Sequence, residues 1–248
     1  MSSTSTTDRP PAPRRRPRRR GLWTTLAVLA ALLVVAAFVG PRVYAALAAD
    51  DAAAPLTTTA ATAATTPTAA SDDATLDGTW AIAPGGTAGY RVEEVLNGQD
   101  VTVTGRTDQV SGALTVTAGQ LTAATVSVDL ASVTTDSSQR DGQFRSSRIM
   151  DVEQHPTADL ALTEPVPLGG LDVGSTLAVD LVGTLTLKGT TRDVTIPATV
   201  QRTAEDAVTV TGSLGLTWSD YGVQAPDLGF VSVQDTGTVE FSVSAVPA

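Results

Sequence analysis

The stretch that decides the fold is Leu121-Thr122-Ala123-Ala124-Thr125-Val126-Ser127-Val128-Asp129-Leu130. In its second half, aliphatic residues alternate with polar ones, so that an extended strand there has one apolar and one polar face. The same period of two recurs at residues 159–162, 177–187, 208–210 and 239–243. This repetition predicts a series of half-buried β-strands.

Short turn signals separate the predicted strands. Asn97-Gly98 lies between two strand-like runs and is the strongest hairpin signal, with Gly85-Gly86, Gly169-Gly170 and Lys188-Gly189 as weaker ones. Eight or nine strands result, which are too many for one open sheet with a solvated face. We therefore expect an all-β domain, an antiparallel barrel or a sandwich.

The interior of this domain has few aromatic residues. Only seven follow residue 76, and the inward positions are mostly Val, Leu and Ala. An eight-stranded barrel is just wide enough to be filled by side chains or to hold one small ligand, and small lining residues favour a cavity. A sandwich packed with Val and Leu would have the same pattern. An apolar cavity without catalytic motifs would suit an elongated apolar molecule.

One segment departs from the strand pattern. Ser138-Gln139-Arg140-Asp141 has the spacing of a helix capping box, and Phe144, Ile149 and Met150 would give the following turns an apolar side. We predict a short helix or helical loop over residues 138–150 that crosses one end of the barrel. An irregular surface loop is the alternative.

The N-terminal fifty residues predict where the domain works. Seven arginines, all within residues 9–20, form a basic tail and precede an apolar stretch at 21–40. A helix of that length spans about 30 Å, the thickness of a bilayer's hydrocarbon core. Since only Arg42 closely follows the stretch, the positive-inside rule predicts a single-pass anchor with a cytoplasmic N-terminus and an extracytoplasmic C-terminal domain.

A cleaved signal peptide is the alternative. Ala46-Leu47-Ala48 matches a small-x-small cleavage pattern, which would release a secreted protein after Ala48. The apolar stretch is longer than the ~7–15 residues of most signal peptides, which favours the anchor. Residues 41–75 are rich in Ala, Thr and Pro and predict a linker, because they have too few large apolar groups to bury. The barrel domain is then residues 76–248.

Composition excludes several classes of function. From residue 76 onward there are 8 basic and 21 acidic residues, so the domain should repel nucleic acid. The chain has no cysteine and a single histidine, His155, so thiolate catalysis, Cys-based metal sites and multi-His sites are excluded. We expect no enzyme activity, no metal and no cofactor. The sequence does not indicate an oligomeric state.

Arg140, Arg145 and Arg148 form the one basic concentration in this acidic domain. They could meet a phosphate or carboxylate head group at one end of the barrel. The alternative is that they pair with nearby carboxylates at Asp141, Asp151 and Glu153.

An ordered set of short motifs runs from Leu76 to Val246. It consists of Trp80, residues 88–92 (AGYRV), 103–106 and 126–130 (VSVDL), Arg140-Asp141 ahead of Phe144, residues 155–158 (HPTA), 183–191 (GTLTLKGTT) with Val194, and 220–223 (DYGV). With these motifs the domain resembles the YceI family, lipocalin-like polyisoprenoid-binding domains exported by bacteria. The basic tail, anchor and Thr-rich tether resemble the actinobacterial branch of that family.

The resemblance implies an extended eight-stranded antiparallel barrel whose apolar bore holds an isoprenoid lipid, such as a quinone or polyprenol, without catalytic residues. Two departures from the family pattern, at Gly89-Tyr90 and Ile149-Met150, fall in regions expected to shape the cavity. The candidate cavity or lid residues are Trp80, Tyr90, Phe144, Ile149, Met150, Leu162, Trp218, Tyr221 and Phe241. A structural or adhesive module with a filled barrel, and an enzyme on a small exported substrate, are the alternative functions.

Overall fold

Strands make up most of the chain that the computed structural model describes, which is residues 53–56 and 76–248 without 97, 228 and 230. They are β1 (Gly78–Ile82), β2 (Thr87–Leu96), β3 (Gln99–Thr107), β4 (Val110–Thr117), β5 (Gln120–Asp129), β6 (Thr157–Leu162), β7 (Val166–Pro167), β8 (Thr176–Leu187), β9 (Thr190–Ala204), β10 (Ala207–Thr217) and β11 (Val231–Pro247). One helix, α2 (Ser138–Arg145), and two 3-10 turns, η1 (Leu130–Ser132) and η2 (Trp218–Tyr221), complete the described elements.

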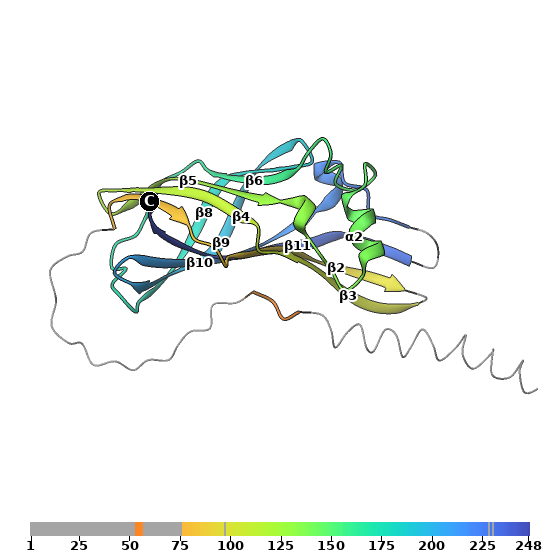
Figure 1. The fold of residues 1–248 in the computed structure, drawn as a ribbon, viewed down its shortest axis with the longest axis horizontal. Coiled ribbons are helices and arrows are strands. Elements are labelled where there is room, and N and C mark those ends of the chain that lie inside the picture. The colour runs from red at the N-terminus through yellow and green to blue at the C-terminus, as the bar shows by residue number, and fades with distance from the viewer. Residues whose placement is uncertain (1–52, 57–75, 97, 228, 230) are drawn as a thin grey trace, which may run out of the picture. The chain divides into compact units, whose positions relative to one another are not determined.

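Eight of these strands form a closed antiparallel barrel in the order β1-β4-β5-β6-β8-β9-β10-β11. Pairing of β1 with β11 closes the ring, with Trp80 opposite Pro247 and Ile82 opposite Ala245. The predicted antiparallel barrel is therefore confirmed and the sandwich is not. The long strand β11 also pairs with β2 through its N-terminal part, so the β2–β3 hairpin extends the wall at one end (Figure 1).

The strand pattern of the sequence matches the structure. Four of the five alternating segments lie within a strand, and the first lies in β5 except for its last residue, Leu130, which begins η1. In β8 the buried positions are every second residue from Leu181 to Leu187. The Lys188-Gly189 turn joins β8 to β9 with positive φ at both residues, 48° and 72°, as a type I′ turn requires. The hairpin predicted at Asn97-Gly98 joins β2 to β3, with Leu96 opposite Gln99. Asn97 itself lies outside the described residues.

The prediction of a helix over residues 138–150 is only partly right. The helix ends at Arg145, and Ser146 stops it because its backbone is extended and its hydroxyl donates to the carbonyl oxygen of Gln143. The predicted capping box is wrong. The N-cap is Ser137, without a side-chain bond, and the Asp141 carboxylate accepts the backbone N–H and hydroxyl of Thr135, at 2.8 Å and 2.7 Å. These bonds attach the helix to the chain that precedes it.

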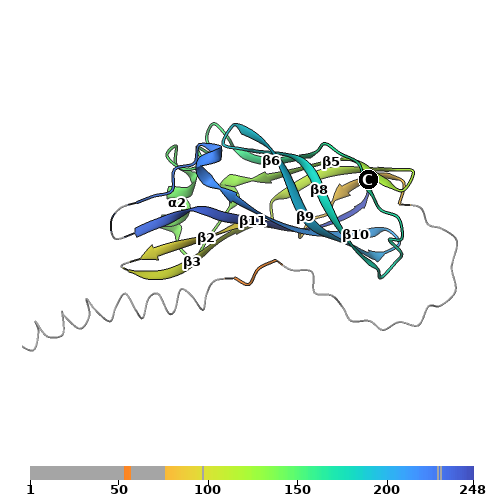
Figure 2. The ribbon, with the colours of Figure 1, turned by 180° about the vertical axis from the view of Figure 1, so that it is seen from behind.

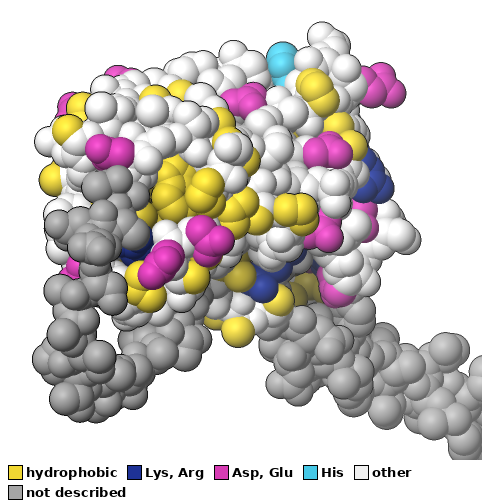
Figure 3. Space-filling model, turned by 60° about the vertical axis from the view of Figure 1, so that its left-hand side comes forward, with side chains coloured by type: hydrophobic (Ala, Val, Ile, Leu, Met, Phe, Trp, Pro, Cys, Tyr) yellow, Lys and Arg dark blue, Asp and Glu magenta, His cyan; other side chains and the backbone are white. Residues whose placement is uncertain are grey.

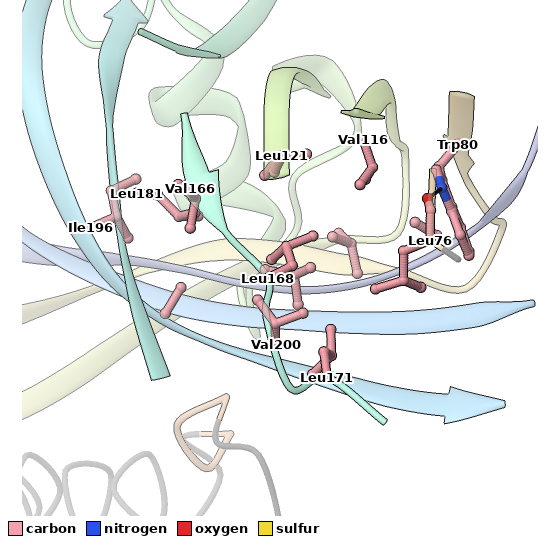
Figure 4. Packing of buried hydrophobic residues seen from close by; sticks show 14 residues of the cluster. Leu76, Trp80, Val116, Leu121, Val166, Leu168, Leu171, Leu181, Ile196 and Val200 are labelled. Atoms are coloured by element: carbon pink, nitrogen blue, oxygen red, sulfur yellow. Dashed lines mark hydrogen bonds between the residues drawn. The ribbon is translucent and has the colours of Figure 1, made fainter. Parts of the chain in front are cut away.

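Two apolar clusters fill the two ends of the barrel. The basal cluster includes Leu76, Trp80, Leu168 and Leu171, and Figure 4 shows their side chains with those of the strands around them. Trp80 Nε1 donates to the Leu76 carbonyl at 2.8 Å, which holds the segment before β1 across the barrel's base. We call the other set the α2 cluster; it contains Val92, Val103, Leu130, Val133, Phe144, Met150, Val152, Leu185, Leu187, Trp218, Tyr221 and Val223.

The outer surface is acidic. Figure 3 shows acidic side chains scattered over one face, with a group of hydrophobic side chains between them. In Figure 2 the ribbon is seen from behind, where β8, β9 and β10 lie side by side as their register requires. The acidic surface agrees with the sequence, in which residues 76–248 have 21 acidic and 8 basic residues, an excess that would repel a nucleic-acid backbone.

Three aromatic side chains of the interior lie against glycines. A Cβ atom on Gly105 would be 2.3 Å from the ring of Tyr90, which is its cross-strand partner on β2. Cβ atoms on Gly212 and Gly237 would be 2.8 Å from the ring of Phe241 and 2.5 Å from that of Trp218. Each glycine therefore provides the space that its aromatic neighbour occupies.

We predict that Gly105→Ala destabilises the protein by about 1–3 kcal/mol, the usual cost of overpacking. Tyr90 cannot easily move, because its ring stacks on Phe144 with centroids 5.3 Å apart and meets Trp218 edge-on at 6.2 Å. Urea unfolding followed by circular dichroism measures the change.

Gly142→Ala is the matched control, since nothing lies within 4 Å of its Cβ and it sits inside α2, where Ala is favoured. That variant should be as stable as the wild type or more so. In a Tyr90→Ala background the cost of Gly105→Ala should disappear. An equal cost in both backgrounds would show that the ring is not what makes Gly105 necessary.

Candidate functional site

A cavity of about 410 Å³ lies at the α2 end of the barrel. We call it the mouth cavity. Strands β2, β3 and β11, helix α2 and the segments that follow α2 and η2 supply its walls. Its apolar lining is Tyr90, Val92, Leu96, Val103, Phe144, Ile149, Met150, Trp218, Val223, Ala225, Pro226, Val231 and Val233.

Polar side chains also line the mouth cavity. They are Glu94, Ser137, Gln139, Arg140, Gln143 and Gln224. The buried carboxylate of Glu94 lies 3.9 Å from Arg140 Nε, and Arg140 also pairs with Asp136 one helical turn before it. The positive charge at the cavity is therefore balanced by two carboxylates. Glutamine amides add hydrogen-bond donors and acceptors without net charge.

Tyr90 lies in the wall of this cavity without an ionised hydroxyl. Burial raises the pKa of Tyr90 to about 12, partly opposed by the charge of Arg140. Burial likewise raises the pKa of Tyr221 at the neighbouring turn η2. Both phenols stay neutral at physiological pH, so the aromatic wall contributes apolar surface and no charge.

A second cavity, which we call the basal cavity, has a volume of about 70 Å³. Every residue that lines it is apolar or glycine: Leu76, Trp80, Ile82, Leu114, Val116, Leu121, Ala124, Val126, Leu160, Ala161, Leu162, Leu168, Leu171, Leu181, Val182, Gly183, Val200, Val208, Val210, Phe241, Val243 and Ala245. The lining includes Leu76, Leu168 and Leu171 from outside the ring's strands, which cover the base of the barrel.

Leu160, Val194 and Leu214 connect the two ends of the interior. All three are partly buried and pack against both the basal cluster and the α2 cluster. We call them the middle layer. Among the described residues, no side chain is less than 2% exposed, as expected where the wall faces open space. The interior is thus apolar from the mouth cavity to the closed base.

The structure places eight of the nine predicted residues on the walls of the two cavities. Tyr90, Phe144, Ile149, Met150 and Trp218 line the mouth cavity. Trp80, Leu162 and Phe241 line the basal cavity. Tyr221 is 3% exposed within the α2 cluster and lines neither. Of the two departures from the family pattern, Ile149-Met150 falls on the wall of the mouth cavity, and so does Tyr90 of Gly89-Tyr90, whereas Gly89 lines neither cavity.

Phe144 was predicted to lie in a short helix or helical loop that crosses one end of the barrel, and in the structure it is a buried residue of helix α2. Phe144 is 6% exposed and belongs to the α2 cluster, so it is part of the core as well as of the cavity wall. Glu94 and Val233 of the mouth cavity and Leu114 and Val126 of the basal cavity were not among the predicted residues. All four lie on strands, where the alternation of inward and outward side chains identifies a lining residue once the strand register is known.

His155, the one histidine of the chain, lines neither cavity. His155 packs against the Lys188-Gly189 turn, where a Cβ on Gly189 would be 2.7 Å from its ring. Within residues 53–56 and 76–248, leaving aside the three undescribed positions, no group of three or more acidic or histidine side chains could hold a metal. The helices in that part of the chain are too short or too polar to cross a membrane, and the stretch at 21–40 lies outside it.

Comparison with known proteins agrees with this architecture. A polyisoprenoid-binding domain from Saccharophagus degradans, implicated in plant cell wall breakdown, superposes with a TM-score of 0.58 at 25% sequence identity, covering 68% of this chain and 98% of the other. BcnA from Burkholderia cenocepacia superposes with a TM-score of 0.51 at 22% identity, covering 63% and 96%. No curated protein matches the chain.

The family match extends over nearly the whole barrel. The model of the YceI-like domain matches residues 80–245, from the first strand of the ring to the last. The chain belongs to the YceI-like family.

Proposed function

We propose that this protein holds an isoprenoid lipid in its barrel, with the tail toward the closed base and the head group in the mouth cavity. The mouth cavity of about 410 Å³ at one end of a barrel whose other end holds a wholly apolar cavity is the observation that carries the proposal. The related domain from Saccharophagus degradans, described as polyisoprenoid-binding, supports it.

The mouth cavity suits an uncharged head group of the quinone or polyprenol type. A phosphate would need uncompensated positive charge. Arg140 is paired with Glu94 and Asp136, and the whole domain is acidic. Gln139, Gln143 and Gln224 can donate to a carbonyl or accept from a hydroxyl.

Burial of apolar area would drive binding. At about 25 cal/mol per Å², a few hundred Å² of enclosed chain contributes several kcal/mol before ordering costs are subtracted. A structural module with a filled barrel would not need the mouth cavity or the space at its base. An enzyme would need a reactive group at the cavity; the chain has no cysteine, and its single histidine, His155, lines neither the mouth cavity nor the basal cavity.

We also propose that the protein is tethered to the outer side of a cytoplasmic membrane, as in actinobacterial members of this family. The arginines before residue 21 and the apolar stretch at 21–40 support this location. A lipid-binding domain held close to a bilayer would have its ligand source within reach.

The first experiment tests occupancy. The protein purified from bacterial membranes in mild detergent should retain a lipid that native mass spectrometry detects and organic extraction identifies. Val233→Phe should lower retention several-fold, because Val233 lines the mouth cavity and a larger ring would fill it. Val173→Phe is the control, since Val173 is 53% exposed.

Delipidated wild type should take up added quinone or polyprenol and reject polyprenyl phosphate. If it takes up none of them, lipid binding is not the function of this barrel. If it prefers the phosphate, the assignment of a neutral head group is wrong.

Tail length can be tested in the basal cavity. Ala124→Leu should weaken binding of long-chain lipids but not of short ones, because Ala124 lines the basal cavity beyond the middle layer. Ala123→Leu, at the exposed neighbouring position, is the control. Equal effects on short and long chains would show that the tail does not pass the middle layer.

The membrane location has a separate test. We expect the mature protein to fractionate with membranes and to keep its N-terminal residues, as N-terminal sequencing would show. Mature protein that begins at Ala49 would identify residues 46–48 as a cleavage site and exclude the anchor.

A further inference from the structure

Glu240 is a buried carboxylate on the outer wall of the barrel. It is 4% exposed, although its strand neighbours Val239 and Phe241 pack against the clusters of the interior. A buried carboxylate is costly unless it is paired and hydrogen-bonded. Arg106 Nη2 donates to Glu240 Oε1 at 2.8 Å, and Arg91 Nη2 lies 3.7 Å from the same oxygen.

Register explains how these three side chains meet. Gly89 of β2 lies between Glu240 of β11 and Arg106 of β3, as the cross-strand partner of both. A Cβ on Gly89 would be 3.0 Å from Arg106 Cγ, so glycine leaves room for the arginine to reach across β2. We call Arg91, Arg106 and Glu240 the wall cluster.

The wall cluster binds the backbone of residues 53–56, the orange segment before the barrel in Figures 1 and 2. Arg91 Nη2 donates to the carbonyl oxygen of Ala53 at 2.6 Å, and Arg106 Nη2 donates to that of Ala54. The Leu56 N–H donates to Glu240 Oε2 at 3.2 Å. The arginines donate to two backbone carbonyls and the carboxylate accepts a backbone N–H, so the wall cluster satisfies both the acceptors and a donor of the bound backbone.

The bound segment has a defined direction. Ala53 lies at Arg91, and Leu56 lies at Glu240, which is opposite Gly89. Because β2 runs toward the mouth cavity as its numbers rise, the Ala53 end is the one nearer the mouth. Ala53 also lines a recess together with Asp136 and Arg140, and Arg140 lines the mouth cavity.

We propose that residues 53–56 are a strap that docks on the wall cluster, so that the chain from the anchor reaches the barrel at its mouth. The strap leaves residues 41–52 as the link to the apolar stretch, which span at most about 40 Å, against about 120 Å for residues 41–75. The strap would hold the mouth toward the membrane. This orientation rests on the proposed anchor, whereas the docking itself does not depend on the anchor or on lipid binding.

Docking can be tested in the full chain in detergent with one spin label. The protein has no cysteine, so Ala54→Cys gives a single labelling site at an exposed side chain whose carbonyl makes the contact. We expect a slow electron paramagnetic resonance component. Leu56→Pro removes the N–H that Glu240 accepts and should convert the label to fast motion without changing the barrel's thermal unfolding. Leu56→Ala, which keeps the N–H, should leave the label slow.

Glu240→Gln tests the barrel side of the contact. It keeps the shape of the side chain but weakens its pairing with both arginines and its bond to the strap. The label at residue 54 should become faster in this variant and stay slow in Arg192→Gln, which removes exposed contacts with the carboxylate and the carbonyl of Asp220, away from the wall cluster. A label that moves equally fast in wild type and Leu56→Pro would overturn the strap.

Orientation can be tested in vesicles that carry an acceptor dye on their head groups. Single donor dyes at Gln224→Cys, on the mouth, and Val173→Cys, in the loop at the base, report which end lies nearer the bilayer. Energy transfer should be greater from the mouth, and Leu56→Pro should reduce that difference while Leu56→Ala preserves it. Equal or greater transfer from the base would overturn the mouth-first orientation. These readouts need no bound lipid, so they can succeed or fail independently of the lipid-retention experiment.

Discussion

The antiparallel pairing of β1 with β11 is the constraint on which the rest of the structure depends. It closes eight strands into a ring, so that their backbone groups bond to one another and no free edge remains in the ring. Closure also encloses a space whose width is set by the strand number, and the small aliphatic residues of this chain leave part of that space open. The cavities are thus a consequence of closing this ring with these residues.

The two ends of the ring differ in polarity, so the interior changes from apolar at the base to partly polar at the mouth. At the base, Leu76, Leu168 and Leu171 cover the opening with apolar side chains alone. At the other end, the β2–β3 hairpin and α2 extend the wall and bring Glu94, Arg140 and glutamines to the cavity. A molecule with an apolar tail and a polar head would match this gradient in only one orientation.

Much of the fold could be predicted from the sequence because strand alternation and turn residues are local signals. The type I′ turn at Lys188-Gly189 and the hairpin after Leu96 need only a few neighbouring residues to be recognised. The end of α2 was missed because Ser146, whose hydroxyl donates to the Gln143 carbonyl, is not a strong stop signal in the sequence. The capping box was wrong because the Asp141 carboxylate bonds to Thr135, outside the helix. β7 was missed because a two-residue strand has no period to detect.

The candidate site was harder to predict because cavities depend on register. Tyr90, Phe144 and Trp218 are far apart in the sequence, yet Tyr90 makes ring contacts with both of the others. The glycines that accommodate Tyr90 and Trp218 lie on other elements, at Gly105 and Gly237. Alternation shows that a strand residue such as Tyr90 faces inward, but not which end of the barrel it lines. Eight of the nine predicted residues therefore line a cavity, although they divide between two of them.

Strand β11 shows how one alternating sequence can serve two surfaces. Val239 and Phe241 face the apolar interior, whereas Glu240 between them faces outward to Arg91, Arg106 and the segment at residues 53–56. A shift of β11 by one residue would put the carboxylate inside the cavity and the aromatic ring outside, which is costly on both faces. The ion pairs on the outer wall and the apolar contacts within therefore favour the same register. Whatever docks on the wall cluster and whatever fills the cavity are thus held by opposite faces of one strand.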